Sequence, residues 1–151
     1  MKMLAQTLLV VLCLVLVPAL PAAESGTERQ VFKHPKADAM GLPFSDAVLV
    51  GNTLYLSGNG GIDMETMTVP EDPKEEARLM MENIRATLAQ ADMGFDDLVS
   101  VTVYCSDLSL YGAFNEVYRT YFSGDFPARA FIGSGPLLFG MRFEMQAIAV
   151  R

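Results

Sequence analysis

Two charged residues near the C-terminus stand inside otherwise apolar, strand-like segments. Arg129 lies in F-P-A-R-A-F-I-G-S, and Glu144 lies in R-F-E-M-Q-A-I-A-V. A guanidinium can bind a carboxylate through two parallel hydrogen bonds, and a carboxylate can position or deprotonate a water molecule. If the two strands border a cleft, these residues would form a small hydrolytic site for an anionic substrate. A structural ion pair between neighbouring strands fits the same pattern equally well.

The rest of the composition excludes several kinds of active site. His34 is the only histidine, and the two cysteines are Cys13 and Cys105. This set cannot supply a zinc site or a Ser-His-Asp triad. Cys105 lies in the β-branched run V-S-V-T-V-Y-C-S-D, where we expect a small buried residue rather than a nucleophile. No glycine-rich phosphate loop follows a strand in the required pattern. We therefore expect chemistry without a metal or an organic cofactor, or no chemistry.

The first 23 residues have the order of a secretory signal peptide. Lys2 provides a positive charge, residues 4–20 are almost wholly apolar, and the small residues Ala22 and Ala23 precede a polar stretch. The pattern predicts cleavage after Ala22 or Ala23 and export to a periplasm or out of the cell. The alternative is an uncleaved anchor, because about 17 apolar residues are near the lower limit for spanning a bilayer.

Residues 24–151 have the size of one domain. Loss of Lys2 with the leader takes the formal charge from −7 to −8. Because contacts to phosphates depend on Lys and Arg, this acidic chain without a basic cluster is not expected to bind nucleic acid. Cys105 would be the only remaining cysteine, which leaves no intrachain disulfide. We expect no membrane association after cleavage.

The elements that would position Arg129 and Glu144 follow from local patterns. Residues 24–43 are polar and are predicted to be an irregular lead-in to a domain spanning 44–151. Residues 47–50 and 53–57 flank Gly51-Asn52 and predict a β-hairpin. The glycine-rich stretch 58–61 is expected to leave the sheet, either as a flexible loop or as backbone that approaches a ligand.

A long amphipathic helix is predicted to begin at Asp72-Pro73 and to end before Gly94. Its apolar residues recur at helical spacing from Ala77 to Ala91, whereas Glu76 is expected to lie outside that stripe. The remaining predicted elements are a strand over 98–105, a helix over 109–122, and strands over 129–134 and 141–150. The order β-β-α-β-α-β-β predicts an α+β domain with two helices on one face of a mixed sheet.

Four segments carry a resemblance to a known family: L-Y-L-S-G-N-G-G-I, N-E-V-Y-R-T-Y-F, F-P-A-R and F-E-M-Q-A-I-A-V. In their order and spacing they resemble the RidA (YjgF) family of reactive-intermediate deaminases, over about residues 41–151. The resemblance implies a chorismate-mutase-like α+β fold, assembled as a homotrimer with clefts between subunits. It implies an enzyme that hydrolyses enamines and imines such as 2-aminoacrylate to 2-keto acids and ammonia, without a metal or organic cofactor.

The resemblance also implies roles for individual residues. Arg129 matches the arginine that holds the substrate carboxylate, and Glu144 matches the glutamate that positions the attacking water. Five further residues are expected to line the cleft: Ser57 and Asn115 through their side chains, Gly58 and Phe131 through their backbones, and Phe44 in place of a common tyrosine.

The departures from the family pattern concern substrate size and rate. Phe44 lacks the tyrosine hydroxyl, and Phe131 stands where a small residue is typical. A non-catalytic protein that binds a small carboxylate or carbonyl ligand in the same cleft is the alternative function. Ribonuclease activity, attributed to some family members, is disfavoured by the acidic charge.

Overall fold

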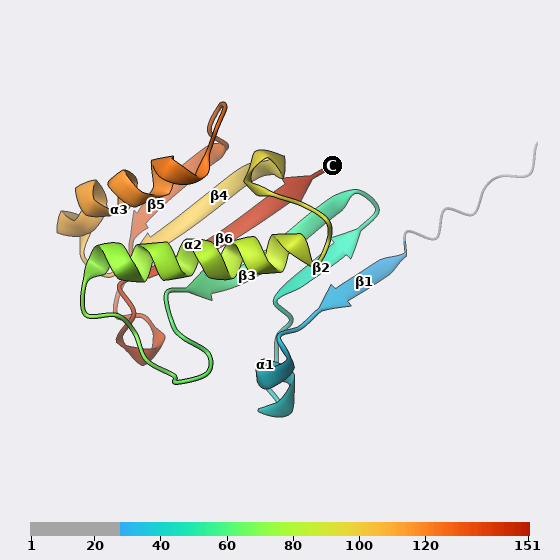
Figure 1. The fold of residues 1–151 in the computed structure, drawn as a ribbon, viewed down its shortest axis with the longest axis horizontal. Coiled ribbons are helices and arrows are strands. Elements are labelled where there is room, and N and C mark those ends of the chain that lie inside the picture. The colour runs from blue at the N-terminus through green and yellow to red at the C-terminus, as the bar shows by residue number, and fades with distance from the viewer. Residues whose placement is uncertain (1–27) are drawn as a thin grey trace, which may run out of the picture.

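The computed structural model describes residues 28–151 and contains one six-stranded sheet with helices (Figure 1). The strands are β1 (Arg29–Phe32), β2 (Ala47–Val50), β3 (Thr53–Gly60), β4 (Leu98–Cys105), β5 (Ala128–Gly133) and β6 (Phe143–Val150), and the helices are α1 (Pro35–Ala39), α2 (Pro73–Ala89) and α3 (Tyr111–Tyr118). The strand order is β1-β2-β3-β6-β4-β5. Only β4 and β5 are parallel neighbours, so the sheet is mixed, as predicted.

Helices α2 and α3 cover one face of the sheet (Figure 1). Helix α2 begins where the sequence predicts, because the Asp72 side chain accepts a hydrogen bond from the Lys74 backbone N–H at 2.8 Å and Pro73 takes the first helical position. The fully buried core between these helices and the sheet includes Met80, Ile84, Leu88, Phe114, Phe143 and Met145. The predicted α+β class, with two helices on one face, is confirmed.

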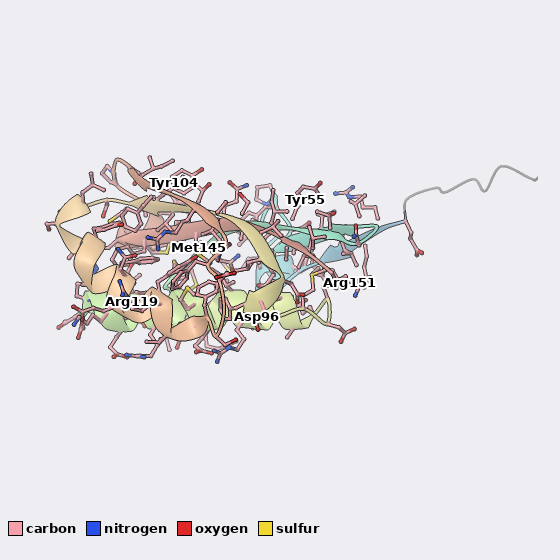
Figure 2. All side chains as sticks on the ribbon, turned by 90° about the horizontal axis from the view of Figure 1, so that it is seen from above. Tyr55, Asp96, Tyr104, Arg119, Met145 and Arg151 are labelled. Atoms are coloured by element: carbon pink, nitrogen blue, oxygen red, sulfur yellow. The ribbon has the colours of Figure 1, made fainter. Side chains whose placement is uncertain are left out.

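The opposite face of the sheet is not covered by any helix of the described residues. In β6, Phe143 and Met145 are fully buried, whereas Gln146 is exposed on the other face. Figure 2 shows Tyr55 and Tyr104 projecting from the side of the sheet away from α2 and α3. The side chains of β6 therefore alternate between the two faces of the sheet, and the open face carries both apolar and polar side chains.

The prediction that residues 58–61 leave the sheet is wrong for most of that stretch. Strand β3 continues to Gly60, where Asn59 pairs with Met145 and Gly60 with Glu144. An irregularity in register between Leu56 and Asn59 accommodates an extra residue. Such a bulge bends the strand locally and keeps the backbone pairing on either side of it.

The lead-in over 24–43, expected to be irregular, contains β1 and α1. Strand β1 forms because its backbone pairs with the edge of β2, a contact that does not require an apolar pattern. Helix α1 begins after His34, whose Nδ1 accepts a hydrogen bond from the Lys36 N–H at 3.3 Å. The predicted signal peptide, residues 1–23, lies outside the described residues. Within residues 28–151, no helix has the length and apolar character needed to cross a membrane.

Candidate active site

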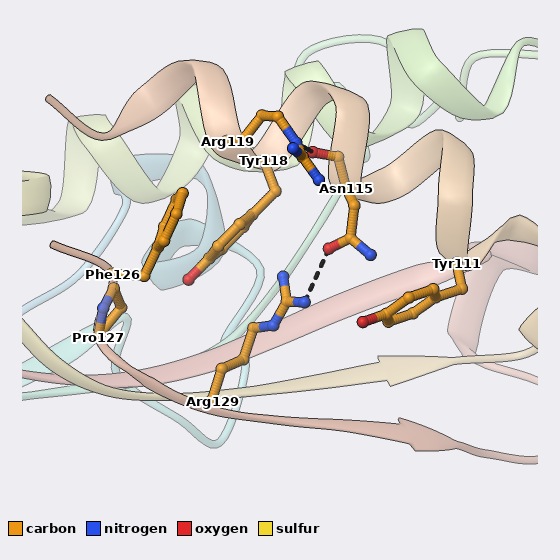
Figure 3. A pocket seen from close by; sticks show the side chains of 7 residues that line it. All are labelled: Tyr111, Asn115, Tyr118, Arg119, Phe126, Pro127 and Arg129. Atoms are coloured by element: carbon orange, nitrogen blue, oxygen red, sulfur yellow. Dashed lines mark hydrogen bonds between the residues drawn. The ribbon is translucent and has the colours of Figure 1, made fainter. Parts of the chain in front are cut away.

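Arg129 lies on the edge strand β5 and points toward α3 (Figure 3). Its Nη2 donates a hydrogen bond to Asn115 Oδ1 at 2.7 Å. Its guanidinium carbon lies 4.4 Å from the centre of the Tyr118 ring, a cation–π contact. Two neighbouring residues of one helix therefore hold the guanidinium plane in a defined orientation.

A pocket of about 340 Å³ opens beside this guanidinium (Figure 3). It is lined by Tyr111, Asn115, Tyr118, Arg119, Phe126, Pro127 and Arg129. Arg129 Nη1 and the Tyr118 hydroxyl are buried and have no hydrogen-bond partner among the described residues. Burial raises the pKa of Tyr118 to about 12, while the positive charge of Arg129 acts in the opposite direction. Arg129 and Tyr118 therefore give the wall of the pocket a fixed cation and a neutral phenol.

Phe131 follows two residues after Arg129 on β5 and is half-buried. Its ring makes edge-to-face contacts with Tyr111, at 4.9 Å between ring centres, and with Phe114, at 5.2 Å. Tyr111 also lines the pocket, so Phe131 supports one of its walls. The side chain thus fills space where the family pattern has a small residue.

Glu144 lies on β6, next to Gly60 of β3 and Tyr104 of β4 in the sheet register. It belongs to the open face, because its neighbours Phe143 and Met145 are buried against the helices. Its carboxylate lies over Gly58: a Cβ atom at that position would be 2.0 Å from Glu144 Oε1. A glycine at position 58 therefore leaves room for the carboxylate.

Ser57 and Phe44 lie at the same end of the β2–β3 hairpin as Gly58. The backbone N–H and the hydroxyl of Ser57 donate hydrogen bonds to the Asp46 carbonyl, at 2.9 and 3.1 Å. Phe44 precedes Asp46 by two residues and is half exposed. Ser57 retains only its acceptor capacity for a ligand, because its hydroxyl proton is engaged.

The seven residues predicted for the site fall into two separate groups. We call Asn115, Arg129 and Phe131 the Arg129 group, and Phe44, Ser57, Gly58 and Glu144 the Glu144 group. Strand β4 separates β5 from β6, so two strand spacings, roughly 10 Å, lie between their backbones. In addition, Arg129 points toward α3 while Glu144 lies on the open face. The structural Arg129–Glu144 ion pair considered above is thus absent from the described residues, and one chain cannot bring both side chains to one small ligand.

One buried charged residue was misplaced by the sequence pattern. Glu76 was expected outside the buried stripe of α2 but is fully buried, and its carboxylate bonds to Arg142. Glu76 precedes Met80 by four residues and Ile84 by eight, and residues at this spacing share a helix face. This spacing could have predicted that Glu76 is buried. Within residues 28–151, no three His, Cys, Asp or Glu side chains are grouped to hold a metal ion.

Comparison with known proteins adds independent information. The family model described as Endoribonuclease L-PSP matches residues 35–151. The mouse (Mus musculus) protein named 2-iminobutanoate/2-iminopropanoate deaminase is 40% identical over 124 residues, covering 82% of this chain and 92% of the relative.

Two solved structures are similar in both sequence and fold. RidA from the Antarctic bacterium Psychrobacter sp. PAMC 21119 is 37% identical, with a TM-score of 0.74 over 81% of this chain and 99% of that chain. E. coli TdcF with bound serine is 30% identical, with a TM-score of 0.70 over 72% of this chain and 88% of that chain.

The prediction of a signal peptide, and of a secreted or periplasmic protein, finds no support in these comparisons, and we correct it. The family match begins at residue 35, after the segment on which that prediction rests. The compared relatives bear the names of imine deaminases and RidA proteins, and none of these names describes an exported protein. We therefore do not describe this chain as exported.

Proposed function

The chain belongs to the RidA family, whose model is described as Endoribonuclease L-PSP, and from this premise we propose that it hydrolyses imines and enamines of amino acids. The products are 2-keto acids and ammonia. The 40% identity to a 2-iminobutanoate/2-iminopropanoate deaminase supports this activity. The resemblance drawn from the four sequence segments is confirmed by the family match.

The observation that carries the proposal is the oriented guanidinium of Arg129 at the pocket wall. Asn115 and Tyr118 hold it, and Nη1 has no partner among the described residues. A cation held in this way is suited to a substrate carboxylate, because charge-assisted hydrogen bonds are stronger than neutral ones. Serine, the ligand named with TdcF, is itself a small carboxylate, which supports the same class of ligand.

In the proposed reaction, Glu144 positions the attacking water molecule. In our proposal Glu144 accepts a proton as the water oxygen bonds to the imine carbon, and the C=N double bond becomes a C–N single bond. The same proton then passes to the nitrogen. The carbinolamine then collapses: its hydroxyl proton passes to the amine, the C=O double bond of the 2-keto acid forms, and the C–N bond breaks to release ammonia. Holding the substrate and the water together makes this addition effectively intramolecular.

We further propose that each site is built between two copies in a homotrimer. Arg129 of one copy would meet Glu144 of the next, since the two side chains of one copy lie on opposite faces of the sheet. The open face, with Tyr55, Ile148 and Gln146, offers a surface for that assembly. A closed ring with head-to-tail contacts gives every copy the same environment. Light scattering tests this arrangement: a mass near three times 16.5 kDa is expected.

The two other functions considered are not favoured. A non-catalytic binding protein is not supported, because the named relatives are deaminases and this chain has both Arg129 and Glu144. Ribonuclease activity, to which the family description refers, is disfavoured by a formal charge of −7.

The test is release of 2-keto acid from an imine generated in situ, measured for the wild type and two variants. Arg129→Ala removes the charge-assisted hydrogen bonding to the substrate carboxylate and is expected to lower kcat/KM by about 100-fold or more. Glu144→Gln removes the proton acceptor and is expected to lower kcat by about 100-fold or more. The control is Arg78→Ala, because Arg78 is an exposed arginine of α2 away from the pocket. The proposal would be overturned if the wild-type protein released keto acid no faster than the uncatalysed reaction, for both small and large imines.

A further inference from the structure

Glu76 on α2 binds the beginning of strand β6. Its Oε1 accepts hydrogen bonds from the backbone N–H groups of Arg142 at 2.5 Å and Phe143 at 3.1 Å. Its Oε2 accepts the Nε–H of Arg142 at 2.5 Å. The Glu76 side chain is fully buried, and that of Arg142 is about a quarter exposed. A buried charge is tolerated when it is paired and hydrogen-bonded in this way.

Arg142 is held from three further directions. Its Nη1 donates to the Glu71 carbonyl at 2.9 Å, and its Nη2 donates to the Pro70 carbonyl. Its own carbonyl accepts the Ser106 N–H at 3.0 Å. Both the backbone and the side chain of Arg142 are therefore fixed, and the loop before α2 is tied to the residue that directly precedes β6.

The same face of α2 also holds the end of strand β3. Asn83, seven residues after Glu76, donates from Nδ2 to the carbonyls of Gly60 and Ile62, both at 3.0 Å. Gly61 lies so close to α2 that a Cβ there would be 2.2 Å from the Glu76 carbonyl oxygen. Only glycine permits this approach of the two backbones. Helix α2 thus holds β3 and β6 at the point where they pair.

Glu144 and Gly58 lie at that point. Glu144 follows Arg142 by two residues, pairs with Gly60 in the sheet, and has its carboxylate over Gly58. Any movement of Arg142 or Gly60 would move the Glu144 carboxylate with the strands. The tolerance is small, because a misplacement of about 1 Å can lower a catalysed rate by roughly 100-fold. Groups that support a catalytic residue are therefore expected to be rigid and fully hydrogen-bonded.

We propose that Glu76, acting through Arg142, is a positioning residue that fixes Glu144 for the attack of water. This inference rests on the deaminase function proposed above. The hydrogen bonds of Glu76 and of the Arg142 side chain go to the start of β6 and to the loop before α2, and none goes to the Arg129 group. Glu76 would therefore govern the step at Glu144 and leave carboxylate binding at Arg129 unchanged. A loss of the Glu76–Arg142 pair is therefore expected to lower kcat with little change in KM.

The experiment compares Glu76→Gln, Arg142→Gln and Arg142→Lys with the wild type, below the unfolding temperature of every variant. Glu76→Gln keeps an oxygen for the two backbone N–H groups but presents an amide to the Arg142 guanidinium. We expect kcat to fall at least tenfold in Glu76→Gln and Arg142→Gln, with KM within twofold of wild type. Arg142→Lys keeps a cation for Glu76, but a single ammonium cannot replace the three nitrogens that bond to Glu76, Glu71 and Pro70, so kcat is expected to recover only in part, to a value above that of Arg142→Gln.

The control is the exposed ion pair between Lys74 and Glu116. Lys74 lies on α2, the helix that carries Glu76, and Glu116 lies on α3. The double variant Lys74→Gln/Glu116→Gln is expected to keep the wild-type kcat. A folded Glu76→Gln or Arg142→Gln variant with wild-type kcat would overturn the inference. The inference would also be overturned if kcat fell only in proportion to the fraction of folded protein. The same holds if the kcat of Arg142→Lys were no higher than that of Arg142→Gln. Absence of turnover in the wild type would instead refute the proposed function on which the inference rests.

Discussion

Arg129 and Glu144 project from opposite faces of the same sheet. Arg129 lies on the edge strand β5 and is held by Asn115 of α3, whereas Glu144 lies on β6 and on the face that no described helix covers. Strand β4 lies between them. Within one chain the two residues can form neither an ion pair nor a common site. The proposed hydrolytic site therefore takes Arg129 and Glu144 from two different copies of the chain.

Gly58→Ala tests the space that the Glu144 carboxylate occupies. The added Cβ would be 2.0 Å from Glu144 Oε1, so the carboxylate must move although the sheet need not. We expect kcat for keto-acid release to fall by at least tenfold, with a melting temperature close to that of wild type. Gly124→Ala is the control, because a Cβ at Gly124 meets nothing within 4 Å. Unchanged kcat in Gly58→Ala would show that the position of this carboxylate does not matter for turnover.

Phe131→Ala tests the limit on substrate size. The half-buried ring supports the pocket wall through Tyr111, so its removal enlarges the space near Arg129. We expect kcat/KM for a bulky imine, such as that of leucine, to rise relative to that of alanine. The free energy of unfolding should fall by about 2 kcal/mol, less than for a fully buried Phe. Leu138→Ala, at a highly exposed position, should change neither quantity. If the ratio of kcat/KM for the leucine imine to kcat/KM for the alanine imine stayed unchanged, this role for Phe131 would be contradicted.

The stability of the fold should decrease in alkali through Tyr118 and Tyr121. Burial raises the pKa of both phenols from 10.0 to about 12. Between these values the unfolded chain loses its phenolic protons while the folded chain keeps them, so stability is full below pH 10 and is lost as pH rises toward 12. Tyr118→Phe should weaken this dependence in urea unfolding measured from pH 8 to 11.5. The same slope in wild type and variant would contradict the assignment to Tyr118.

Much of the fold could be predicted from local patterns. The two long strands 98–105 and 143–150 and the start of α2 follow from β-branched runs, alternation and a capping residue. Strand β1 could not be predicted in this way, because it forms through backbone pairing at a sheet edge. The burial of Glu76 was not predicted, because a charged residue is expected at the surface unless its partner is known, and its partner Arg142 is distant in the sequence.

The candidate site was predictable in its membership but not in its arrangement. The charged residues in apolar strand-like runs singled out Arg129 and Glu144, and resemblance to a family supplied the other five residues. The side chains of β6 alternate between the two faces, which separates Glu144 from the buried Phe143 and Met145. Nothing in the spacing revealed that Arg129 would face α3, because this depends on how β5 pairs with β4. The roles of the seven residues stay predictions until the variants are measured.

Mixing two inactive variants tests the central claim most directly. Arg129→Ala and Glu144→Gln chains, each near background alone, would be unfolded, combined in equal amounts and refolded. If each site takes Arg129 from one copy and Glu144 from the next, random assembly in a closed ring leaves about a quarter of the sites intact. We predict recovery of about a quarter of the wild-type keto-acid release. A mixture that stays at the background of its two parents would contradict a site shared between copies.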